Sequence, residues 1–443
     1  MNNLEKKIEN RSANVVVVGL GYVGLPVACL LAEAGFKVVG INRGQEKVDL
    51  INKGISPIEG KEPSLAPLVK KVVRKGCLSA TTDYSVCKKA DIVLIAVETP
   101  VDAKTKTPKY LALRSALMSL AENLKKGALV IVESTIAPGT MKYVVGPFLE
   151  EKSGLKINKE IYLGHCPERV MPGKLLHNLR SYHRAVGGST PETAGVMKKL
   201  YKTYVKGNLD LTDMATAEVV KTTENYYRDV EIAFANQLAL LCEQLGVNVH
   251  EARKLVNKVE SRNVHMPGAG VGGHCIPKDG YLNVAFLRGK NNDASIATNM
   301  ADLARKINDF MPIHTANLVF DSLKEKRIDT KEAKIVVLGY AYLENSDDTR
   351  NSPSEDLINS LKGKSKNVYV HDPYVEEYKV DLEKTLKGSD AVVLMVAHDQ
   401  YRKLSLKKVK NLMKTPILID GRNIFDKDKA EKIGFVYKGI GNV

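Results

Sequence analysis

The stretch "NVVVVGLGYVGLPVACLLAEAG", Asn14 to Gly35, sets the class of fold. Its opening run of four valines, its glycine-rich middle and its apolar end predict a strand, a tight turn and a helix. In a G-x-G-x-x-G turn the first glycine permits the turn, the second admits a pyrophosphate, and the third packs helix against strand. A glycine turn without a ligand is the alternative. The dinucleotide-binding residues that this turn predicts are Gly19, Gly21, Tyr22, Val23 and Gly24.

Similar apolar runs recur on both sides of a helical middle section. They lie at residues 36–41, 91–100, 128–135, 333–341, 367–374, 389–399 and 416–423. Continuous apolar strands separated by helical patterns predict parallel sheets that are covered on both faces. We therefore expect an α/β protein with two Rossmann-like, doubly wound domains at residues 1–209 and 311–443. A central helical region at 210–310 would carry the active site and the dimer contacts.

One uninterrupted helical pattern stands out in this central region. Residues 216–246 contain no proline and only a terminal glycine, so they predict one long helix. Such a helix suits a spacer and the surface of a homodimer or higher homo-oligomer. Lys221, Asn225 and Arg228 share one of its faces. They could orient a reacting hydroxyl and stabilise an alkoxide, or they could simply form a solvated polar face.

The charge and cysteine content of the chain indicate which kinds of ligand and compartment to expect. The net charge of +15 over 443 residues favours anionic ligands, but the lysines are spread along the chain and there is no Trp. This pattern argues for small anions rather than nucleic acid. The six scattered cysteines form no C-x-x-C pair, which predicts neither a metal site nor disulfides and suits the cytoplasm. Glycines and Pro26 interrupt the uncharged run 15–32, so we expect no membrane segment.

The end of the second strand departs from the usual pattern of an NAD site. An acidic residue commonly holds the ribose hydroxyls there, whereas this chain has Asn42 followed by Arg43. The amide could still bind a hydroxyl, and the guanidinium could hold a 2′-phosphate. The motif alone therefore leaves NAD and NADP open.

A second glycine-rich segment, "PGAGVGGHCIPKDG" at 267–280, surrounds a single cysteine, Cys275. Its glycines would leave N–H groups available to face an oxyanion, as acyl chemistry at a thiol requires. His274 and Lys278 are candidate cations that would activate the thiol. A buried structural cysteine is the alternative, and the loop alone does not decide between the two.

Taken together, the chain resembles the UDP-glucose/GDP-mannose dehydrogenase family over nearly its full length. The matching stretches, in family order, are "VVGLGYVGLP", "VETPVD", "ESTIAPGT", "CPERVMPG", "VVKTTEN", "GVGGHCIPKD" and "DDTRNSPSEDL". The resemblance implies a four-electron oxidation of the 6-hydroxyl of a UDP-sugar, with NAD as the cofactor. It implies a covalent thiohemiacetal and thioester on the cysteine. The implied catalytic residues are Cys275, Lys221, Asn225, Asp279 and Glu168.

The resemblance also implies the ligand contacts. Cofactor contacts would include Asn42, Thr99, Thr135 and Arg350, and the last α/β domain would bind the UDP part. Two loops are similar to the branch that acts on UDP-N-acetylhexosamines, foremost UDP-N-acetylmannosamine; UDP-N-acetylglucosamine and UDP-glucose are alternatives. The implied substrate contacts are Arg169, Val170, Lys221, Asn225, Arg228, Arg262, Gly272 and Tyr342.

Two further consequences come from the resemblance. The family normally has lysine where this chain has Leu343, so one expected contact is missing. The product would be an acidic sugar nucleotide for a surface polysaccharide. A non-catalytic nucleotide-sugar binding protein on the same scaffold is the competing hypothesis, although it would not need the set of Lys221, Asn225, Cys275 and Asp279.

Overall fold

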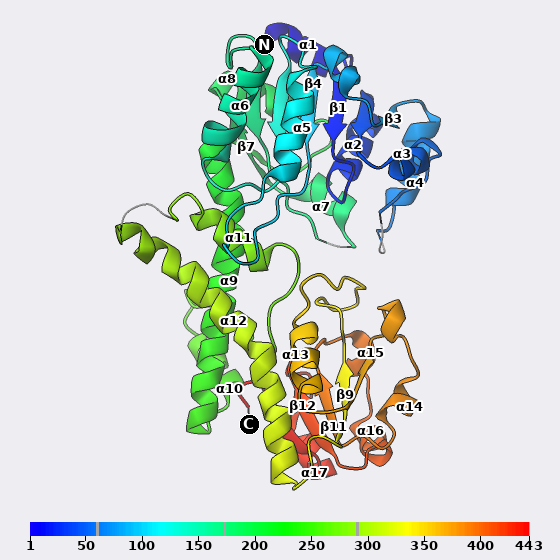
Figure 1. Ribbon diagram of the computed structural model, residues 1–443, viewed down its shortest axis with the longest axis vertical. Coiled ribbons are helices and arrows are strands. Elements are labelled where there is room, and N and C mark those ends of the chain that lie inside the picture. The colour runs from blue at the N-terminus through cyan, green and yellow to red at the C-terminus, as the bar shows by residue number, and fades with distance from the viewer. Residues whose placement is uncertain (59–61, 172, 289–291, 443) are drawn as a thin grey trace. The chain divides into compact units, whose positions relative to one another are not determined.

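The computed structural model describes residues 1–58, 62–171, 173–288 and 292–442. The chain divides into two compact units, Met1–Glu224 with Tyr281–Gly289 and Asn225–Gly280 with Lys290–Val443. Each unit has one main sheet and its own hydrophobic cores (Figure 1). The division into residues 1–209, 210–310 and 311–443 stays a prediction.

The sheet of the first unit contains the predicted dinucleotide fold. Its strands lie in the order β3-β2-β1-β4-β5-β6-β7-β8, and neighbours run parallel except β6 and β7. The first six strands have the order 3-2-1-4-5-6 of a doubly wound dinucleotide-binding fold. Their bounds are β1 Asn14–Val18, β2 Lys37–Ile41, β3 Leu78–Thr81, β4 Ile92–Ile95, β5 Leu129–Val132, β6 Tyr162–His165, β7 Arg184–Gly188 and β8 Leu209–Asp213.

Both faces of this sheet are buried, which explains the unbroken valine run. Val15 and Val17 pack into the core that contains α2, while Val16 and Val18 pack into the core that contains α5. Each such buried side chain contributes about 1.5–3 kcal/mol. The helices of this unit are α1 Asn2–Glu9, α2 Gly24–Glu33, α3 Gln45–Asn52, α4 Leu65–Arg74, α5 Leu111–Ala121, α6 Gly146–Ser153, α7 Leu175–Ser181 and α8 Pro191–Tyr201.

The second unit repeats the plan with a smaller, fully parallel sheet in the order β10-β9-β11-β12-β13. Ile335 and Val337 face one core, and Val336 and Leu338 face the other. The elements are β9 Lys334–Leu338, α13 Pro353–Lys362, β10 Asn367–His371, α14 Leu382–Leu386, β11 Ala391–Leu394, α15 Asp399–Arg402, α16 Leu406–Leu412, β12 Ile417–Asp420, α17 Lys427–Ile433 and β13 Val436–Gly439. Two doubly wound α/β domains are thereby confirmed.

The helical section contains the predicted long helix and a second one. Its helices are α9 Met214–Leu245, α10 Val249–Val256, α11 Ile276–Val284 and α12 Asn292–Glu325. Within the second unit, Arg305 of α12 pairs with Asp229 of α9 at 2.7 Å, and Asn236 donates to Asn308 at 2.8 Å. The expected helical region ended at residue 310, whereas α12 continues through Pro312 to Glu325. The predicted boundary at 310/311 therefore falls inside one helix.

Candidate active site

The turn between β1 and α2 has the shape that a pyrophosphate requires. Gly19 has φ +92°, and a Cβ there would lie 2.5 Å from Ala96 O. A Cβ at Gly24 would lie 1.9 Å from Gly19 O, whereas no described atom lies within 4 Å of that position at Gly21. In the described structure no side chain caps the N-terminus of α2, whose N-cap is Val23. Open space beside uncapped amides fits the phosphates of a dinucleotide.

Tyr22 is tied to two other segments through a residue that the sequence did not single out. Its hydroxyl donates to Glu62 Oε1 at 2.5 Å, and the carboxylate of Glu62 also accepts the N–H groups of Gly173 and Leu175. The carboxylate thus joins the dinucleotide turn to the start of α7. Nothing in the local sequence around Glu62 signals this contact.

Neutral and basic groups occupy the end of β2. Asn42 Oδ1 accepts the N–H of Gly44 at 2.9 Å, which leaves its amide NH₂ as a donor for a hydroxyl. The guanidinium of Arg43 lies 3.8 Å from Glu98, and both side chains are largely exposed. This end of the strand therefore carries no carboxylate of its own for the ribose.

The predicted cofactor contacts Thr99 and Thr135 lie together after β4 and β5. Thr99 is buried and its Oγ1 donates to the carbonyl of Thr135 at 2.6 Å. Parallel strands end at the same edge of a sheet, which is where ligands of this fold bind. Both residues are thus at the edge that the sequence predicted.

The segment after β6 places Glu168, Arg169 and Val170. Glu168 is buried, and its Oε2 has no hydrogen-bond partner among the described residues. Arg169 Nε donates to both oxygens of Glu224 in α9 at 2.8 Å, and its Nη1 donates to a backbone carbonyl. Val170 packs at the margin of the core. Glu224 was not predicted, because one carboxylate among many on a long helix gives no sequence signal.

A second buried carboxyl group lies near Glu168. Glu133 follows β5 directly, accepts the Tyr201 hydroxyl at 2.8 Å, and lies 3.6 Å from the buried Arg184. Burial, which outweighs the lowering effects of Arg184 and Tyr201, raises the pKa of Glu133 to about 7. The group therefore changes charge near neutral pH, and the sequence analysis did not include it.

The three predicted residues on one face of α9 differ in burial. Lys221 is buried and Asn225 is partly buried, while Arg228 is exposed. Asn225 Nδ2 donates to Asp279 Oδ2 at 2.6 Å, and Lys278 Nζ donates to Asp279 Oδ1 at 2.6 Å. The hydrogen bond between Asn225 and Asp279 thus joins residues 54 positions apart in the sequence. The face of α9 at Lys221 and Asn225 is therefore not simply solvated.

Cys275 lies at the N-terminal end of α11 and is exposed. The N–H groups of Lys278 and Asp279 donate to its carbonyl at 3.1 and 2.9 Å, so it begins the first turn of the helix. The positive end of a helix favours negative charge. Because its side chain is exposed, Cys275 is not a buried structural cysteine. The start of α11 would favour the thiolate form, an effect that the sequence did not predict.

The structure shows which groups bind the expected cations and oxyanion donors. The ammonium of Lys278 binds Asp279. Desolvation of the ring, with the charges of Lys278 and Arg350 nearby, lowers the pKa of His274 and so disfavours its charged form. The N–H of Gly273 donates to Arg350 O rather than facing a ligand, and those of Gly268 and Gly270 are also bonded.

Four remaining predicted residues lie in loops of the second unit. A Cβ at Gly272 would lie 2.7 Å from Tyr342 Cβ, so these two segments are in direct contact. Arg350 Nε donates to Asp348 Oδ1 at 2.9 Å. Arg262 follows α10 with an exposed side chain that donates to Ser261 Oγ at 2.7 Å. Leu343, at the position of the missing lysine, is 38% exposed.

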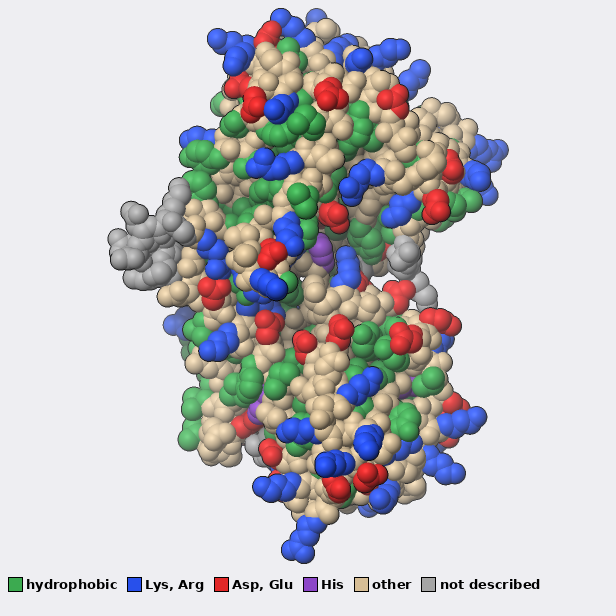
Figure 2. All heavy atoms as spheres, viewed as in Figure 1, with side chains coloured by type: hydrophobic (Ala, Val, Ile, Leu, Met, Phe, Trp, Pro, Cys, Tyr) green, Lys and Arg blue, Asp and Glu red, His purple; other side chains and the backbone are tan. Residues whose placement is uncertain are grey.

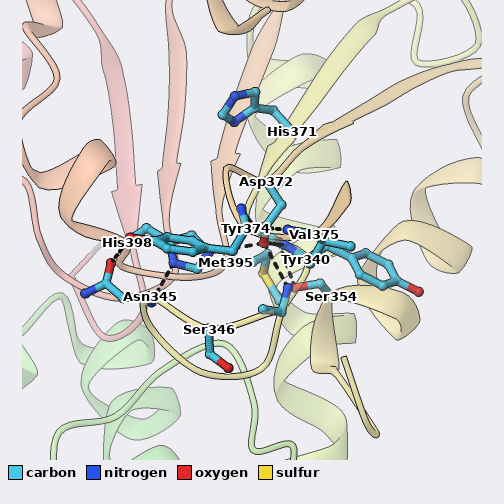
Figure 3. A network of polar contacts seen from close by, with 12 residues as sticks. Tyr340, Asn345, Ser346, Ser354, His371, Asp372, Tyr374, Val375, Met395 and His398 are labelled. Carbon is cyan, nitrogen blue, oxygen red and sulfur yellow. Dashed lines mark hydrogen bonds and ion pairs between the residues drawn. The ribbon is translucent and has the colours of Figure 1, made fainter. Parts of the chain in front are cut away.

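The glycine turn of the second α/β domain is closed by protein atoms. Figure 3 shows Asp372, directly after β10, among backbone N–H groups and His398. Its Oδ2 accepts the N–H groups of Tyr340 and Ala341 at 2.7 and 3.0 Å, and His398 Nε2 lies 3.1 Å away. The carboxylate occupies the amides that would hold a phosphate in a dinucleotide turn. This domain is therefore not a second site of that kind.

Across 1–58, 62–171, 173–288 and 292–442, no helix is both long and apolar enough to cross a membrane. In the same residues no group of three or more His, Cys, Asp or Glu is placed to hold a metal ion. Lys and Arg side chains are scattered over the face drawn in Figure 2 rather than gathered into one stripe.

Comparison with known proteins agrees with this geometry. Models of the UDP-glucose/GDP-mannose dehydrogenase family match residues 13–205 as the NAD binding domain, 215–310 as the central domain and 336–427 as the UDP binding domain. The chain is 40% identical over 427 residues to a protein named UDP-N-acetyl-D-mannosamine dehydrogenase from Pyrococcus horikoshii, covering 96% of this chain and 99% of that one.

Two solved structures are similar over almost the whole chain. The structure titled as the Pyrococcus horikoshii UDP-D-ManNAc dehydrogenase has a TM-score of 0.89 at 39% identity, covering 97% and 99% of the two chains. An NDP-N-acetyl-D-galactosaminuronic acid dehydrogenase from Methanosarcina mazei has a TM-score of 0.87 at 39% identity, covering 100% and 98%. Fold and site together define an NAD-dependent oxidoreductase. Within that class, the chain belongs to the UDP-glucose/GDP-mannose dehydrogenase family.

Proposed function

We propose that the protein is a UDP-N-acetyl-D-mannosamine 6-dehydrogenase, which oxidises the 6-hydroxyl to a carboxylate. The observation that carries the proposal is the arrangement on α11. Exposed Cys275 begins the helix, and one turn later the buried carboxylate of Asp279 is bonded by Asn225 and Lys278. The Pyrococcus horikoshii relative of that name, 40% identical, supports the choice of sugar.

The first oxidation would use the polar side chains of α9 and α11. Lys221 and Asn225 would hold the sugar O6 and stabilise the alkoxide, while Asp279 would take its proton through a water molecule. The turn from Gly19 to Gly24, with Asn42, Thr99 and Thr135, would hold NAD, which would supply the hydride acceptor. The sugar is left as an aldehyde.

The second oxidation would proceed on Cys275. The sulfur adds to the aldehyde carbon, and the oxygen takes the proton, which gives a thiohemiacetal. Transfer of a second hydride, for which a second NAD would be the acceptor, would give a thioester, and Glu168 would assist the water that hydrolyses it. The water supplies the second carboxylate oxygen and the thiol is restored. Two hydrides thus leave for each sugar oxidised.

The remaining predicted contacts would hold the substrate and cofactor. Arg169, Val170, Arg228 and Arg262 would contact the UDP-sugar, as would Gly272 and Tyr342. Arg350 would reach the cofactor. Among these contacts, Arg169 has the best-defined guanidinium, because it donates to both oxygens of Glu224. Arg169 also follows Glu168 directly in the chain.

Four alternatives predict different outcomes. The Methanosarcina mazei structure supports a second candidate, an N-acetylgalactosamine nucleotide as substrate. UDP-N-acetylglucosamine and UDP-glucose are further candidate substrates. A non-catalytic nucleotide-sugar binding protein would bind such ligands without reducing NAD.

Turnover in the presence of a panel of sugars tests the proposal. With UDP-N-acetylmannosamine we expect two NADH for each sugar consumed, and Cys275→Ser should lose steady turnover because it lacks the nucleophile. The matched panel contains UDP-N-acetylgalactosamine, UDP-N-acetylglucosamine and UDP-glucose, each with NAD and NADP. Faster turnover of another sugar would reassign the substrate. Tight binding of every sugar without reduction would favour the binding protein.

We further propose that the protein is a homodimer that pairs through the central helices. Tyr227, Phe234 and Leu241 recur at seven-residue intervals on α9, and each is more than half exposed. A continuous apolar stripe over several turns is typical of a helix–helix contact. A second copy of the chain is the partner that we expect. Sedimentation equilibrium should give twice the chain mass, and a monomer at micromolar concentration would contradict the proposal.

We propose a cytoplasmic enzyme whose acidic sugar nucleotide is used for a surface polysaccharide. Cell fractionation with an antibody would locate the protein. Deletion of its gene should remove the uronic acid from the polysaccharide, and an unchanged sugar composition would argue against this role.

A further inference from the structure

The peptide groups of Gly273, two residues before Cys275, are held by two consecutive residues of the second α/β domain. The N–H of Gly273 donates to Arg350 O at 2.9 Å, and Asn351 Nδ2 donates to Gly273 O at 3.0 Å. Both polar groups of this glycine are thus satisfied by the loop before α13. We call this pair of contacts the Gly273 clamp.

The clamp is also a steric contact. A Cβ at Gly272 would lie 2.6 Å from Asn351 O, and a Cβ at Gly273 would lie 2.7 Å from the ring of Tyr342. Real Cβ atoms do not approach other atoms so closely. These two glycines therefore allow the loop before α13 to approach the backbone before Cys275.

The loop that forms the clamp is itself anchored. Ser352 Oγ donates to Tyr340 O at 2.6 Å and accepts the N–H of Ser354, so it caps α13. Asn351 adopts φ +47°, a left-handed conformation that asparagine tolerates better than most residues. Its amide group therefore projects from a fixed point at the start of a helix.

We propose that Asn351 is a positioning residue, which fixes the thiol of Cys275 through Gly273. The catalytic part of this inference rests on the proposed function, in which the sulfur attacks an aldehyde carbon. Without the Asn351 bond, the peptide of Gly273 can rotate, and the sulfur leaves its place at the start of α11. Misplacement of a reacting group by about 1 Å can cost on the order of 100-fold in rate.

Two substitutions at Asn351 test the clamp. Asn351→Gly removes the donor, adds no charge and keeps the left-handed conformation accessible. Asn351→Asp keeps the size of the side chain but replaces the donor with a carboxylate oxygen, which cannot donate to the carbonyl of Gly273. This second variant can be measured if the glycine variant does not fold. Asn423→Gly is the matched control, because Asn423 is another left-handed asparagine of the same unit, with φ +52°.

The first readout does not depend on any substrate. Alkylation of Cys275 by iodoacetamide at about pH 7.5, followed on the peptide that contains it, should slow about threefold in both Asn351 variants as the sulfur leaves the helix end. The control should react like the wild type. Equal rates in all four proteins would overturn the inference, even if the protein oxidised no sugar.

The second readout separates positioning from binding. In the Asn351 variants kcat should fall at least about tenfold while KM for the UDP-sugar stays within about twofold, because the clamp acts on the thiol and not on the sugar. A rise in KM with kcat unchanged would instead place Asn351 in substrate binding and overturn the inference. Absence of NAD reduction by the wild-type protein would contradict only the proposed function.

Discussion

At the scale of single residues, Asp372 accounts for the difference between the two glycine turns. In the first unit the corresponding amides open onto free space beside Gly21. In the second unit the same kind of turn donates Tyr340 N–H and Ala341 N–H to a buried carboxylate. The side chain of Asp372 therefore accepts amides of the second turn that would otherwise be available to a phosphate.

Substitution Asp372→Asn should destabilise the second unit. Burial raises the pKa of this carboxyl, but hydrogen bonds from His398 and from the backbone at Ala341, Tyr374 and Tyr340 outweigh it and lower the pKa to about 2. These bonds favour the charged form, so they add about 2 kcal/mol to the free energy of unfolding at neutral pH. About half of this contribution is lost by about pH 3, because the carboxyl becomes protonated in the unfolded chain first. Denaturant unfolding should show a variant less stable by about that amount, with a difference that shrinks on acidification.

Hydrogen exchange gives a local check on Asp372. The amides of Tyr340 and Ala341 should exchange faster in the variant because they lose their acceptor. Asp428→Asn, at an exposed position of α17, is the matched control. If the Asp372 and Asp428 variants unfold at the same denaturant concentration, the carboxylate does not hold the turn.

Some residues of the site could be predicted from the sequence, and others could not. Gly19 and Gly24 were predictable, because steric contacts there exclude any side chain and the spacing is characteristic. Glu62 and Glu224 were not predictable, because a carboxylate that joins distant segments leaves no local pattern. The glycines before Cys275 were interpreted as oxyanion donors, whereas Gly273 serves a contact with residues almost eighty positions later.

At the scale of elements, regular patterns were predicted and interrupted ones were not. The strands and α9 followed directly from apolar runs and from a segment without proline. Helix α12 was missed as one element because Pro312 lies inside it, and proline normally ends or kinks a helix. Helix α11 was read as a loop because glycines precede it, although Pro277 is tolerated in a first turn.

At the scale of the whole molecule, the proposed reaction draws on both compact units. Glu168, Lys221 and the dinucleotide turn belong to the first unit, and Cys275, Asn225 and Asp279 belong to the second. The chain crosses between them within α9 and α11, the two helices that carry most of these residues. Neither unit alone contains the full set, so each expressed separately would lack turnover under the proposed mechanism.

Trapping of the covalent intermediate tests the central claim most directly. In Glu168→Gln the proposed hydrolysis is slowed, while both hydride transfers remain possible. After incubation with NAD and UDP-N-acetylmannosamine, mass spectrometry of the digested variant should find the sugar nucleotide, joined as a thioester, on the peptide that contains Cys275. Glu168→Gln combined with Cys275→Ser should carry no adduct. An unmodified Cys275 in a variant that still forms NADH would contradict the account, because oxidation would then proceed without the thiol.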